Sequence, residues 1–489
     1  MISISVSTLL IICCFICVIF FILAEKNRAI VSISGALVTY FILIFIDNRD
    51  SSIIVELLFG TTVDNYVNLH SLMLILGMMF IVHISDEIGT FQFLAVIAIK
   101  MSRGKPIPLV TILCVVSVVF SSILNNILTV MILIPLTITI SRVLNVSPTP
   151  YILTQAIMVN VGGTIFSISS IPNILIVKSA EITFPVYFLE IGFFSIIIFA
   201  FTIIFFIFLY KSELSIPKDK AINILLYDFD IWNVVQSRRL LYASLSAIII
   251  LMISFFIIPE DFLPPDIIAL GIAMILTIIS RIDSTEVSKI IKKFDYELLF
   301  YLLGIFVITG GMEVVGVIDL IEDIFRNIGG GNEFIQIIII MWIAAFSSSL
   351  IDNIPITKVL IPIVDEMAIN SSSLLNKNRY FYSLSIGANW GDNLTPLGDN
   401  ILVLNIAKEN NRPISIRTFW KIGFITTLYQ LLLATLFFIL ILSFSLGIFI
   451  LMVIGVIIGF IIILMKKGPF KIQSRIDKGI FMFRNFIIA

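Results

Sequence analysis

The stretch Ser347-Ser348-Ser349-Leu350-Ile351-Asp352-Asn353-Ile354-Pro355 places an acid and an amide inside otherwise apolar sequence. A related stretch, Ser121-Ser122-Ile123-Leu124-Asn125-Asn126-Ile127, lies 227 positions earlier. The same offset, without a gap, relates more than 60 residues and also aligns Leu133-Ile134-Pro135 with Leu360-Ile361-Pro362. Shared Gly, Asn and Pro residues at one offset are rare by chance, so we predict that the chain contains two copies of one unit.

Each copy continues into a second polar segment that should interrupt a helix. Gly162-Gly163-Thr164 precedes Pro172-Asn173, and Gly391-Asp392-Asn393 precedes Gly398-Asp399-Asn400 at an offset of about 229. Broken backbone within a membrane is tolerated where it lines a cavity or is buried in protein. The exposed helix ends then offer N–H groups to anions and C=O groups to cations. These segments are therefore candidates for ligand binding.

The surrounding composition indicates an all-α polytopic membrane protein. Hydrophobic residues make up 59% of the 489 residues and charged residues only 13%, with a mean hydropathy of +1.13. Soluble domains have about 45–50% apolar and about 25% charged residues. Uncharged runs such as Pro106–Ser141 and Ile422–Met465 are long enough for membrane helices, and we expect roughly ten to thirteen membrane segments.

The order of these features divides the chain into five parts. We expect an N-terminal transmembrane helix (1–24), a first repeat (25–210), a polar linker (211–239), a second repeat (240–446), and an extra C-terminal helix with a basic tail (447–489). The first segment lacks the basic start and the cleavage site of a signal peptide, so we interpret it as a retained helix. We interpret the four cysteines, Cys13, Cys14, Cys17 and Cys114, as small buried hydrophobic residues rather than metal ligands.

Loop charges predict that the two repeats are inverted. The loop before the first Asn pair contains only basic charges, whereas the equivalent loop of the second copy is mainly acidic. The residues are Lys100, Arg103 and Lys105 in the first loop, and Glu322, Asp323, Arg326 and Glu333 in the second. The positive-inside rule places the two loops on opposite faces. The basic tail after Met465 should be cytoplasmic, or alternatively lie on the membrane surface as an amphipathic segment.

Asn125-Asn126 and Asp352-Asn353 are expected at the tips of two re-entrant hairpins. The apolar runs beside Asn125-Asn126 have about 15 residues each, which is short for a tilted crossing. The alternative is two ordinary helices joined by a turn in which the Asn residues act as turn formers. The matching Asp352-Asn353 in the second copy favours the hairpins.

Four charged residues lie within apolar sequence: Asp352, Lys358, Asp392 and Asp399. A charge at mid-bilayer costs about 2.5–3.5 kcal/mol on insertion scales, so these residues are candidates for charge or proton coupling. Asp352 and Lys358 are six positions apart and do not share a helix face. Lys358 is therefore expected to pair with Asp392 or Asp399. The alternative is structural ion pairing without a role in transport.

Several motifs resemble the ArsB/NhaD branch of the ion transporter superfamily, over about residues 29–446. They are Leu76-Gly77-Met78-Met79, Ser102-Arg103-Gly104, Asn160-Val161-Gly162-Gly163 and, most specifically, Ser347–Pro355. Within this branch, the pattern is closest to citrate-transporter-like and P-protein-like permeases.

The resemblance implies two inverted repeats, each with a re-entrant hairpin and an unwound transmembrane helix. It also implies a homodimer in which a transport domain moves like an elevator against a scaffold, with ligands held between the hairpin tips and the unwound segments. The chain departs from the family pattern at Asn125, where many relatives have Asp. It also departs at Gly398-Asp399-Asn400, which is short and acidic, and at Lys358, where a small or apolar residue is common.

The predicted site contains polar residues of all four broken segments. The expected substrate- and ion-binding residues are Asn125, Asn126, Thr129, Gly162, Gly163, Thr164, Asn173, Asp352, Asn353, Thr357, Asn393, Thr395 and Asn400. Coupling is assigned to Asp352, Lys358, Asp392 and Asp399, and a Na⁺ site is predicted at Asn126, Asp352 and Asn353.

These residues predict a secondary transporter that moves a small anion, a carboxylate or an oxyanion, together with Na⁺ or H⁺. A Na⁺/H⁺ antiporter is the rival interpretation, and a channel or an intramembrane enzyme is a more distant one. The chain lacks P-loop, GxSxG and HExxH motifs, so neither an ATP-driven pump nor a hydrolase of these classes is expected. We expect no cofactor and no nucleic-acid partner. The protein should be embedded in lipid, and we expect it in the plasma membrane with the C-terminus in the cytoplasm.

Overall fold

The computed structural model is built from helices throughout the part of the chain that it describes. The described residues are 5–24, 27–61, 66–211, 213–214, 231–280, 288, 290–327, 332–369, 374–396, 400–445, 447–453 and 482. Most of the predicted linker and nearly all of the basic tail lie outside these ranges, as does Asp399.

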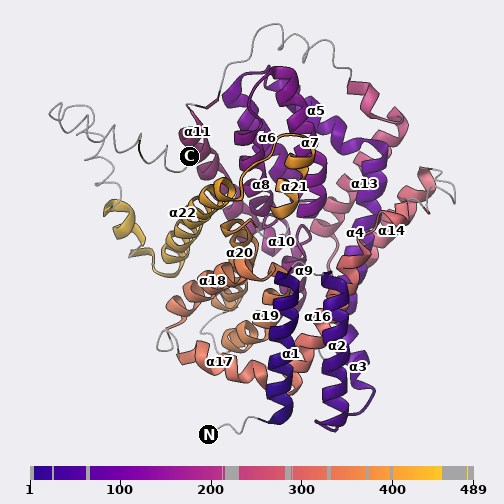
Figure 1. Cartoon of the computed structure of the whole chain (residues 1–489), viewed down its shortest axis with the longest axis vertical. Helices are drawn as coiled ribbons and strands as arrows, with labels where there is room; N and C mark the ends of the chain where they lie inside the picture. The colour runs from indigo at the N-terminus through magenta and orange to yellow at the C-terminus, as the bar shows by residue number, and fades with distance from the viewer. Residues whose placement is uncertain are drawn as a thin grey trace.

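The N-terminal helix α1 (Val6–Leu23) is followed by the first copy, which contains a hairpin and an interrupted helix (Figure 1). The elements of this copy are α2 (Arg28–Phe45), α3 (Ile53–Phe59), α4 (Val67–Ile88), α5 (Thr90–Met101), α6 (Pro106–Ser121), α7 (Asn126–Leu144), α8 (Thr149–Gly162), α9 (Ile171–Ala180), α10 (Phe184–Tyr187), η1 (Phe188–Gly192) and α11 (Phe193–Tyr210).

The second copy repeats this order after a short 3₁₀ helix. Its elements are η3 (Ile231–Val234), α13 (Arg238–Ile257), α14 (Pro265–Ile279), α16 (Tyr296–Val314), α17 (Val317–Asn327), α18 (Glu333–Leu350), α19 (Asn353–Ile369), α20 (Leu374–Gly391), η4 (Asp392–Leu394), α21 (Asn400–Glu409) and α22 (Ile416–Leu442).

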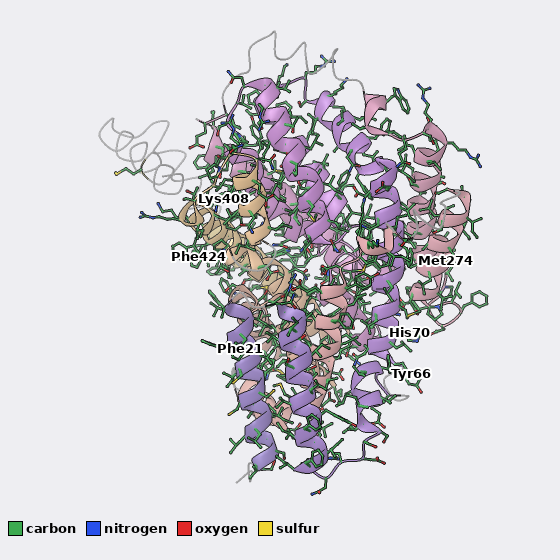
Figure 2. All side chains as sticks on the ribbon, turned by 45° about the vertical axis from the view of Figure 1, so that its right-hand side comes forward. Phe21, Tyr66, His70, Met274, Lys408 and Phe424 are labelled. Carbon is green, nitrogen blue, oxygen red and sulfur yellow. The ribbon has the colours of Figure 1, made fainter. Side chains whose placement is uncertain are left out.

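Eight helices in the described part are long and apolar enough to cross a membrane, and further apolar helices are shorter. Large apolar side chains face outward along them. Phe21 of α1 is 49% exposed and Met274 of α14 is 45% exposed, and both lie on the outside of the molecule in Figure 2. Outward-facing apolar surface of this kind suits a lipid environment, where it need not be hidden from water.

The cysteines of α1 differ from the prediction. Cys13 and Cys17 are exposed and Cys14 is partly buried, whereas Cys114 is buried in α6. The prediction of buried side chains was therefore wrong for Cys13 and Cys17. The physical reason is that α1 lies at the outer edge of the helix assembly, where apolar residues can face lipid instead of a protein core.

The two copies are inverted relative to each other. In Figure 1, α5 and the hairpin α6–α7 occupy the upper end of the molecule, whereas their counterparts α17 and α18–α19 occupy the lower end. The copies also exchange contacts, because α2 packs on α16 of the second copy and α14 packs on α4 of the first.

These two helix pairs have equivalent polar contacts. The basic side chain belongs to α2 in one pair, and the acidic side chain belongs to α14 in the other. Arg28 at the start of α2 lies 3.9 Å from Glu297 of α16, measured from Nε to Oε1. Asp266 at the start of α14 lies 3.0 Å from His70 of α4, measured from Oδ2 to Nδ1. His70 and Glu297 are separated by the repeat offset of 227. The two helix pairs are thus equivalent in the two copies.

Close backbone contact within each copy explains one pair of glycines. A methyl group on Gly162, at the end of α8, would lie 2.6 Å from the carbonyl oxygen of Val118 in α6. A methyl group on Gly391, at the end of α20, would overlap the carbonyl oxygen of Ala345 in α18. Val118 and Ala345 are again 227 positions apart. Each hairpin therefore packs against the helix that leads into the broken segment.

Candidate functional site

The hairpin tips are formed by residues that cap the second helix of each hairpin. Asn125 is the N-cap of α7, and its Oδ1 accepts a hydrogen bond of 2.8 Å from the backbone N–H of Leu128. Asp352 precedes α19, and its Oδ1 accepts from the backbone N–H of Ile354 at 3.3 Å. Asn and Asp favour this position because their side chains satisfy free N–H groups of the first turn. These residues thus end one helix and start the next inside each hairpin.

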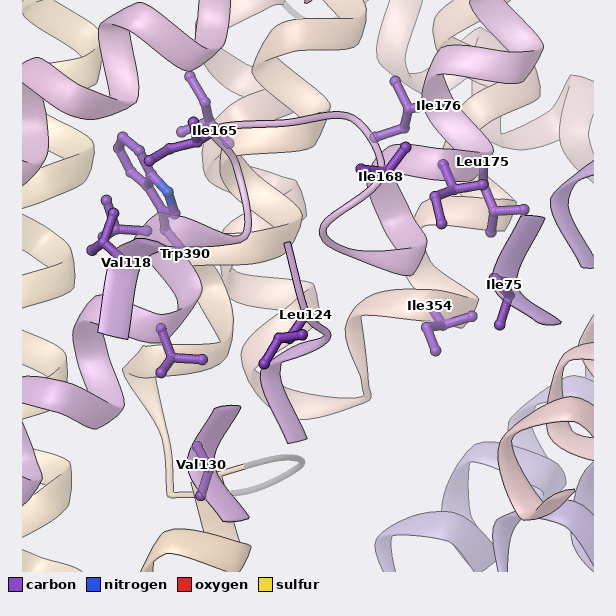
Figure 3. Close-up of a cluster of buried hydrophobic side chains, with 14 of the residues drawn as sticks. Ile75, Val118, Leu124, Val130, Ile165, Ile168, Leu175, Ile176, Ile354 and Trp390 are labelled. Atoms are coloured by element: carbon purple, nitrogen blue, oxygen red, sulfur yellow. The ribbon is translucent and has the colours of Figure 1, made fainter. Parts of the chain in front are cut away.

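The two tips face each other across a cavity inside the molecule. Its volume is about 40 Å³, and it is bounded by both tips, by the start of α9 and by the start of α2. Asn125 and Asn126 line it from one hairpin, and Asp352 and Asn353 line it from the other. Figure 3 shows Leu124 of the first tip and Ile354 of the second hairpin in one cluster of buried apolar side chains. Four predicted site residues from distant parts of the chain therefore surround one space.

In the first copy, the tip is connected to the interrupted helix by buried amides. Ser121 donates to the backbone carbonyl of Val159 and to Asn126 Oδ1, the latter at 2.9 Å. Asn126 Nδ2 then donates to Asn160 Oδ1 at 2.7 Å. Asn126 and Asn160 are both buried.

In the second copy, the equivalent serine and asparagine meet a carboxylate. Ser348 donates to the carbonyl of Ala388 at 2.6 Å and to Asp392 Oδ1 at 2.7 Å. Asn353 Nδ2 donates to Asp392 Oδ2 at 2.6 Å. Ser348 and Asn353 occupy the places of Ser121 and Asn126 one repeat earlier. Asp392 is 7% exposed, so a charge at this position is shielded from solvent.

Asparagines also hold the two unwound segments in shape. Asn173 Nδ2 donates to the carbonyl of Gly163 at 2.6 Å, and Asn400 Nδ2 donates to the carbonyl of Asp392 at 2.8 Å. The two copies are also bonded to each other here, because Asn160 Nδ2 donates to Asn393 Oδ1 at 2.8 Å. Buried polar groups need such partners, since an unsatisfied one costs about 1–3 kcal/mol.

Arg28 brings a positive charge to the cavity. Its Nη1 donates to Asp352 Oδ2 at 3.3 Å, and its guanidinium lies 5.8 Å from the centre of the Tyr301 ring. Arg28 belongs to α2, whereas Asp352 belongs to a hairpin tip 324 positions later. Arg28 and Asp352 are the charged residues in the described lining of this cavity.

Lys358 makes a contact that was not predicted from the sequence. Its Nζ donates to Asn68 Oδ1 of α4 at 2.8 Å and lies 5.2 Å from the centre of the Phe306 ring. The described residues show no ion pair between Lys358 and Asp392, and Asp399 lies outside the described part. Lys358 is thus directed along α16, on which α19 packs, toward α4.

The predicted threonines lie in several environments. Thr129 donates to the carbonyl of Asn125 at 3.0 Å, within the first turn of α7, and Thr395 donates to the carbonyl of Ser349. Thr164 accepts from Trp390 Nε1 at 3.1 Å. Thr357 is buried, and its hydroxyl has no hydrogen-bond partner. None of these four threonines is part of the described cavity lining between the tips.

Three residues of this site were not predicted from the sequence: Ser121, Ser348 and Asn160. The serines had a signal, because they are aligned by the repeat offset that also aligns Asn126 and Asn353. Arg28 had no such signal, because its place beside Asp352 depends on the packing of α2 against the second copy.

Comparison with known families identifies the chain. A model of the family described as citrate transporter matches residues 18–387 and 263–470, which together span most of the sequence.

Relatives with curated descriptions are transporters and membrane proteins. An uncharacterized transporter of Mycobacterium tuberculosis is 27% identical over 366 residues, which cover 74% of this chain and 84% of that protein. The P protein of Homo sapiens is 23% identical over 476 residues, which cover 81% of this chain and 55% of the P protein.

The fold is similar to that of a solved transporter. The crystal structure of the Alcanivorax borkumensis YdaH transporter, described as having an unusual topology, superposes with a TM-score of 0.54. The superposition covers 77% of this chain and 85% of YdaH, at 13% sequence identity.

Proposed function

The chain belongs to the citrate transporter family, and we propose that this secondary transporter moves a small organic or inorganic anion coupled to Na⁺ or H⁺. The observation that carries the proposal is the cavity between the hairpin tips, where Arg28 supplies a positive charge that contacts Asp352 and lies beside neutral amide and hydroxyl groups. The start of α9 lines the same cavity, and helix N-termini favour anions.

The cation is proposed to bind next to this cavity, around the residues of the hairpin tips. Asn126, Asp352 and Asn353 line the cavity together, and amide and carboxylate oxygens suit Na⁺ as a hard cation. Asp392 would adjust the charge of this region, because it accepts hydrogen bonds from both Ser348 and Asn353.

Transport is proposed to occur by an elevator-type movement. The hairpins α6–α7 and α18–α19, with the interrupted helices α8–α9 and α20–α21, would form the moving part. The helices α2, α4, α14 and α16 would form the scaffold, in a homodimer of the plasma membrane with a cytoplasmic C-terminus. The contacts between Arg28 and Asp352 and between Lys358 and Asn68 join the two parts, so these contacts must break when the hairpins move.

Na⁺/H⁺ antiport is a second candidate, and the position of Asp392 favours it. A buried carboxylate with two side-chain donors can exchange a proton for a cation during a transport cycle. In this case no anion would be needed.

Proteoliposomes loaded with a pH-sensitive dye would distinguish the candidates. We expect a Na⁺ or H⁺ gradient to drive uptake of an added carboxylate or oxyanion. A change of lumenal pH caused by Na⁺ without any added transportable anion, and abolished in Asp352→Asn, would instead establish antiport. Empty liposomes are the control for passive leakage.

A further inference from the structure

The cavity between the tips adjoins a second cavity whose chemistry is different. This second cavity has a volume of about 40 Å³ and shares Asn125, Ser170, Ile171 and Leu298 with the first. In Figure 3, Ile75 of α4 and Ile168 of the unwound loop lie on the same side of Leu124 as Ile354. One continuous site would therefore have two compartments.

The second compartment is almost entirely apolar. Its lining comes from α4, the first hairpin, the loop before α9, α9 itself and α16, and the polar side chains in the described lining are those of Asn125, Ser169 and Ser170. The apolar side chains that line it include those of Ile75, Met78, Met79, Val82, Leu128 and Ile174. Methionine side chains adapt to irregular shapes, so such a surface can accept differently shaped apolar groups.

Ser170 lines both compartments, and its buried hydroxyl group is unpaired in the protein. It is 5% exposed, and its Oγ has no hydrogen-bond partner in the structure. It is the N-cap residue of the ten-residue helix α9, yet its side chain makes no capping bond. An uncapped helix N-terminus beside an unpaired hydroxyl group is suited to accept an anionic oxygen.

The charges around the two compartments limit the charge of the substrate. The described linings contain one cation, Arg28, and one carboxylate, Asp352, which contact each other. A carboxylate placed between Arg28, Asn125 and Ser170 would have suitable partners. A second or third carboxylate reaching into the other compartment would be surrounded by aliphatic side chains, where an unpaired charge is strongly unfavourable.

We propose that the substrate is an amphipathic monoanion whose single carboxylate binds beside Arg28 and Ser170 and whose apolar body occupies the compartment formed by α4, α7 and α9. This inference rests on the proposed anion transport and specifies its substrate class. It also distinguishes this chain from a carrier of small polycarboxylates, because the second compartment offers no partner for further charges.

The proposal is tested with purified full-length protein by equilibrium binding and by uptake into proteoliposomes, using acetate, hexanoate and citrate as probes. Each buried methylene group strengthens binding roughly fourfold, so hexanoate should bind at least about tenfold more tightly than acetate. Citrate should bind more weakly than hexanoate. Arg28→Gln should weaken the binding of both monocarboxylates, and Arg28→Lys should restore part of it.

A substitution that fills the apolar compartment separates this proposal from general anion binding. Leu128→Trp should abolish the preference for hexanoate while acetate binding remains. The matched control is Leu136→Trp, because Leu136 is also half-buried on α7 but lines neither cavity. It should keep the preference for hexanoate.

These experiments test the substrate class separately from anion transport itself. If citrate is transported and hexanoate is neither bound nor transported, the proposed substrate class is wrong while anion transport stands. An unchanged hexanoate preference in correctly folded Leu128→Trp would also overturn it. If no anion of any class is transported under a Na⁺ or H⁺ gradient, the proposed function itself fails.

Discussion

At the scale of single residues, the two copies differ most at the position after the glycine of the broken segment. The first copy has Gly163 and the second has Asp392, within the same framework of a serine, an asparagine and a backbone carbonyl. The first framework is therefore neutral, whereas the second contains a carboxylate that is buried near the cavity. Ion or proton handling is expected to depend mainly on this second framework.

Replacing Asp392 with Asn should separate coupling from folding. The substitution preserves shape but removes the acidic group that accepts from Ser348 and Asn353. Hydrogen bonds to charged groups contribute about 1.5–3 kcal/mol, so we expect a moderate loss of stability together with a loss of ion-coupled uptake of at least about tenfold. Thermal unfolding in detergent and uptake into proteoliposomes measure the two effects.

The control for this substitution is Asp261→Asn, because Asp261 is exposed in the loop before α14. It should leave uptake and stability unchanged. Full retention of ion-coupled uptake in Asp392→Asn would show that Asp392 has no part in coupling.

At the scale of elements, each hairpin depends on a glycine contact with its neighbouring interrupted helix. Gly162 and Gly391 end α8 and α20 at the points where their backbones touch α6 and α18. Small residues at such crossings allow helices to approach closely in membrane proteins. The contact fixes where each helix stops, and thus where the broken segment meets the hairpin tip.

Gly391→Ala should destabilise the protein and reduce transport. The added methyl group would overlap the carbonyl of Ala345, and overpacking of this kind costs about 1–3 kcal/mol. Thermal unfolding of the purified protein is the measurement. Gly271→Ala in α14 is the matched control, because a methyl group there meets no atom within 4 Å. Equal stability of the two variants would contradict the packing argument.

At the scale of the whole molecule, contacts join the proposed moving part to the proposed scaffold. Lys178 of α9 lies 3.1 Å from Glu260 of the loop before α14, measured from Nζ to Oε2. Both residues lie away from the cavity between the tips. An elevator-type movement of α9 against α14 must separate them.

A cross-link between these positions should therefore stop transport. In a background where the four native cysteines are replaced by Ala, Lys178→Cys with Glu260→Cys is joined by a short reagent that reacts with two thiols. Uptake should fall when the link forms and recover when it is reduced. The control pair is Arg142→Cys with Asn410→Cys, which joins α7 and α21 of the moving part, where Arg142 contacts the carbonyl of Asn410. Undiminished uptake in the linked Lys178 and Glu260 pair would exclude the movement.

The amino-acid sequence alone determined the membrane-embedded helical class, the duplication and the places where helices break. These properties depend on local composition and on the spacing of Gly, Asn and Pro, which repeat along the chain and need no knowledge of packing. The helix bounds agree with this reading, because α7 and α19 begin at Asn126 and Asn353, and α8 and α20 end at Gly162 and Gly391.

Only the tertiary structure decided which polar groups meet. Asn160 bonds to Asn393 across 233 positions, and Arg28 reaches Asp352 across 324 positions. Lys358 contacts Asn68 across 290 positions. Such pairings depend on how the inverted copies pack against each other, and helix periodicity contains no information about that packing. The repeated units could be predicted locally, whereas the charge and shape of the cavity arise from contacts between them.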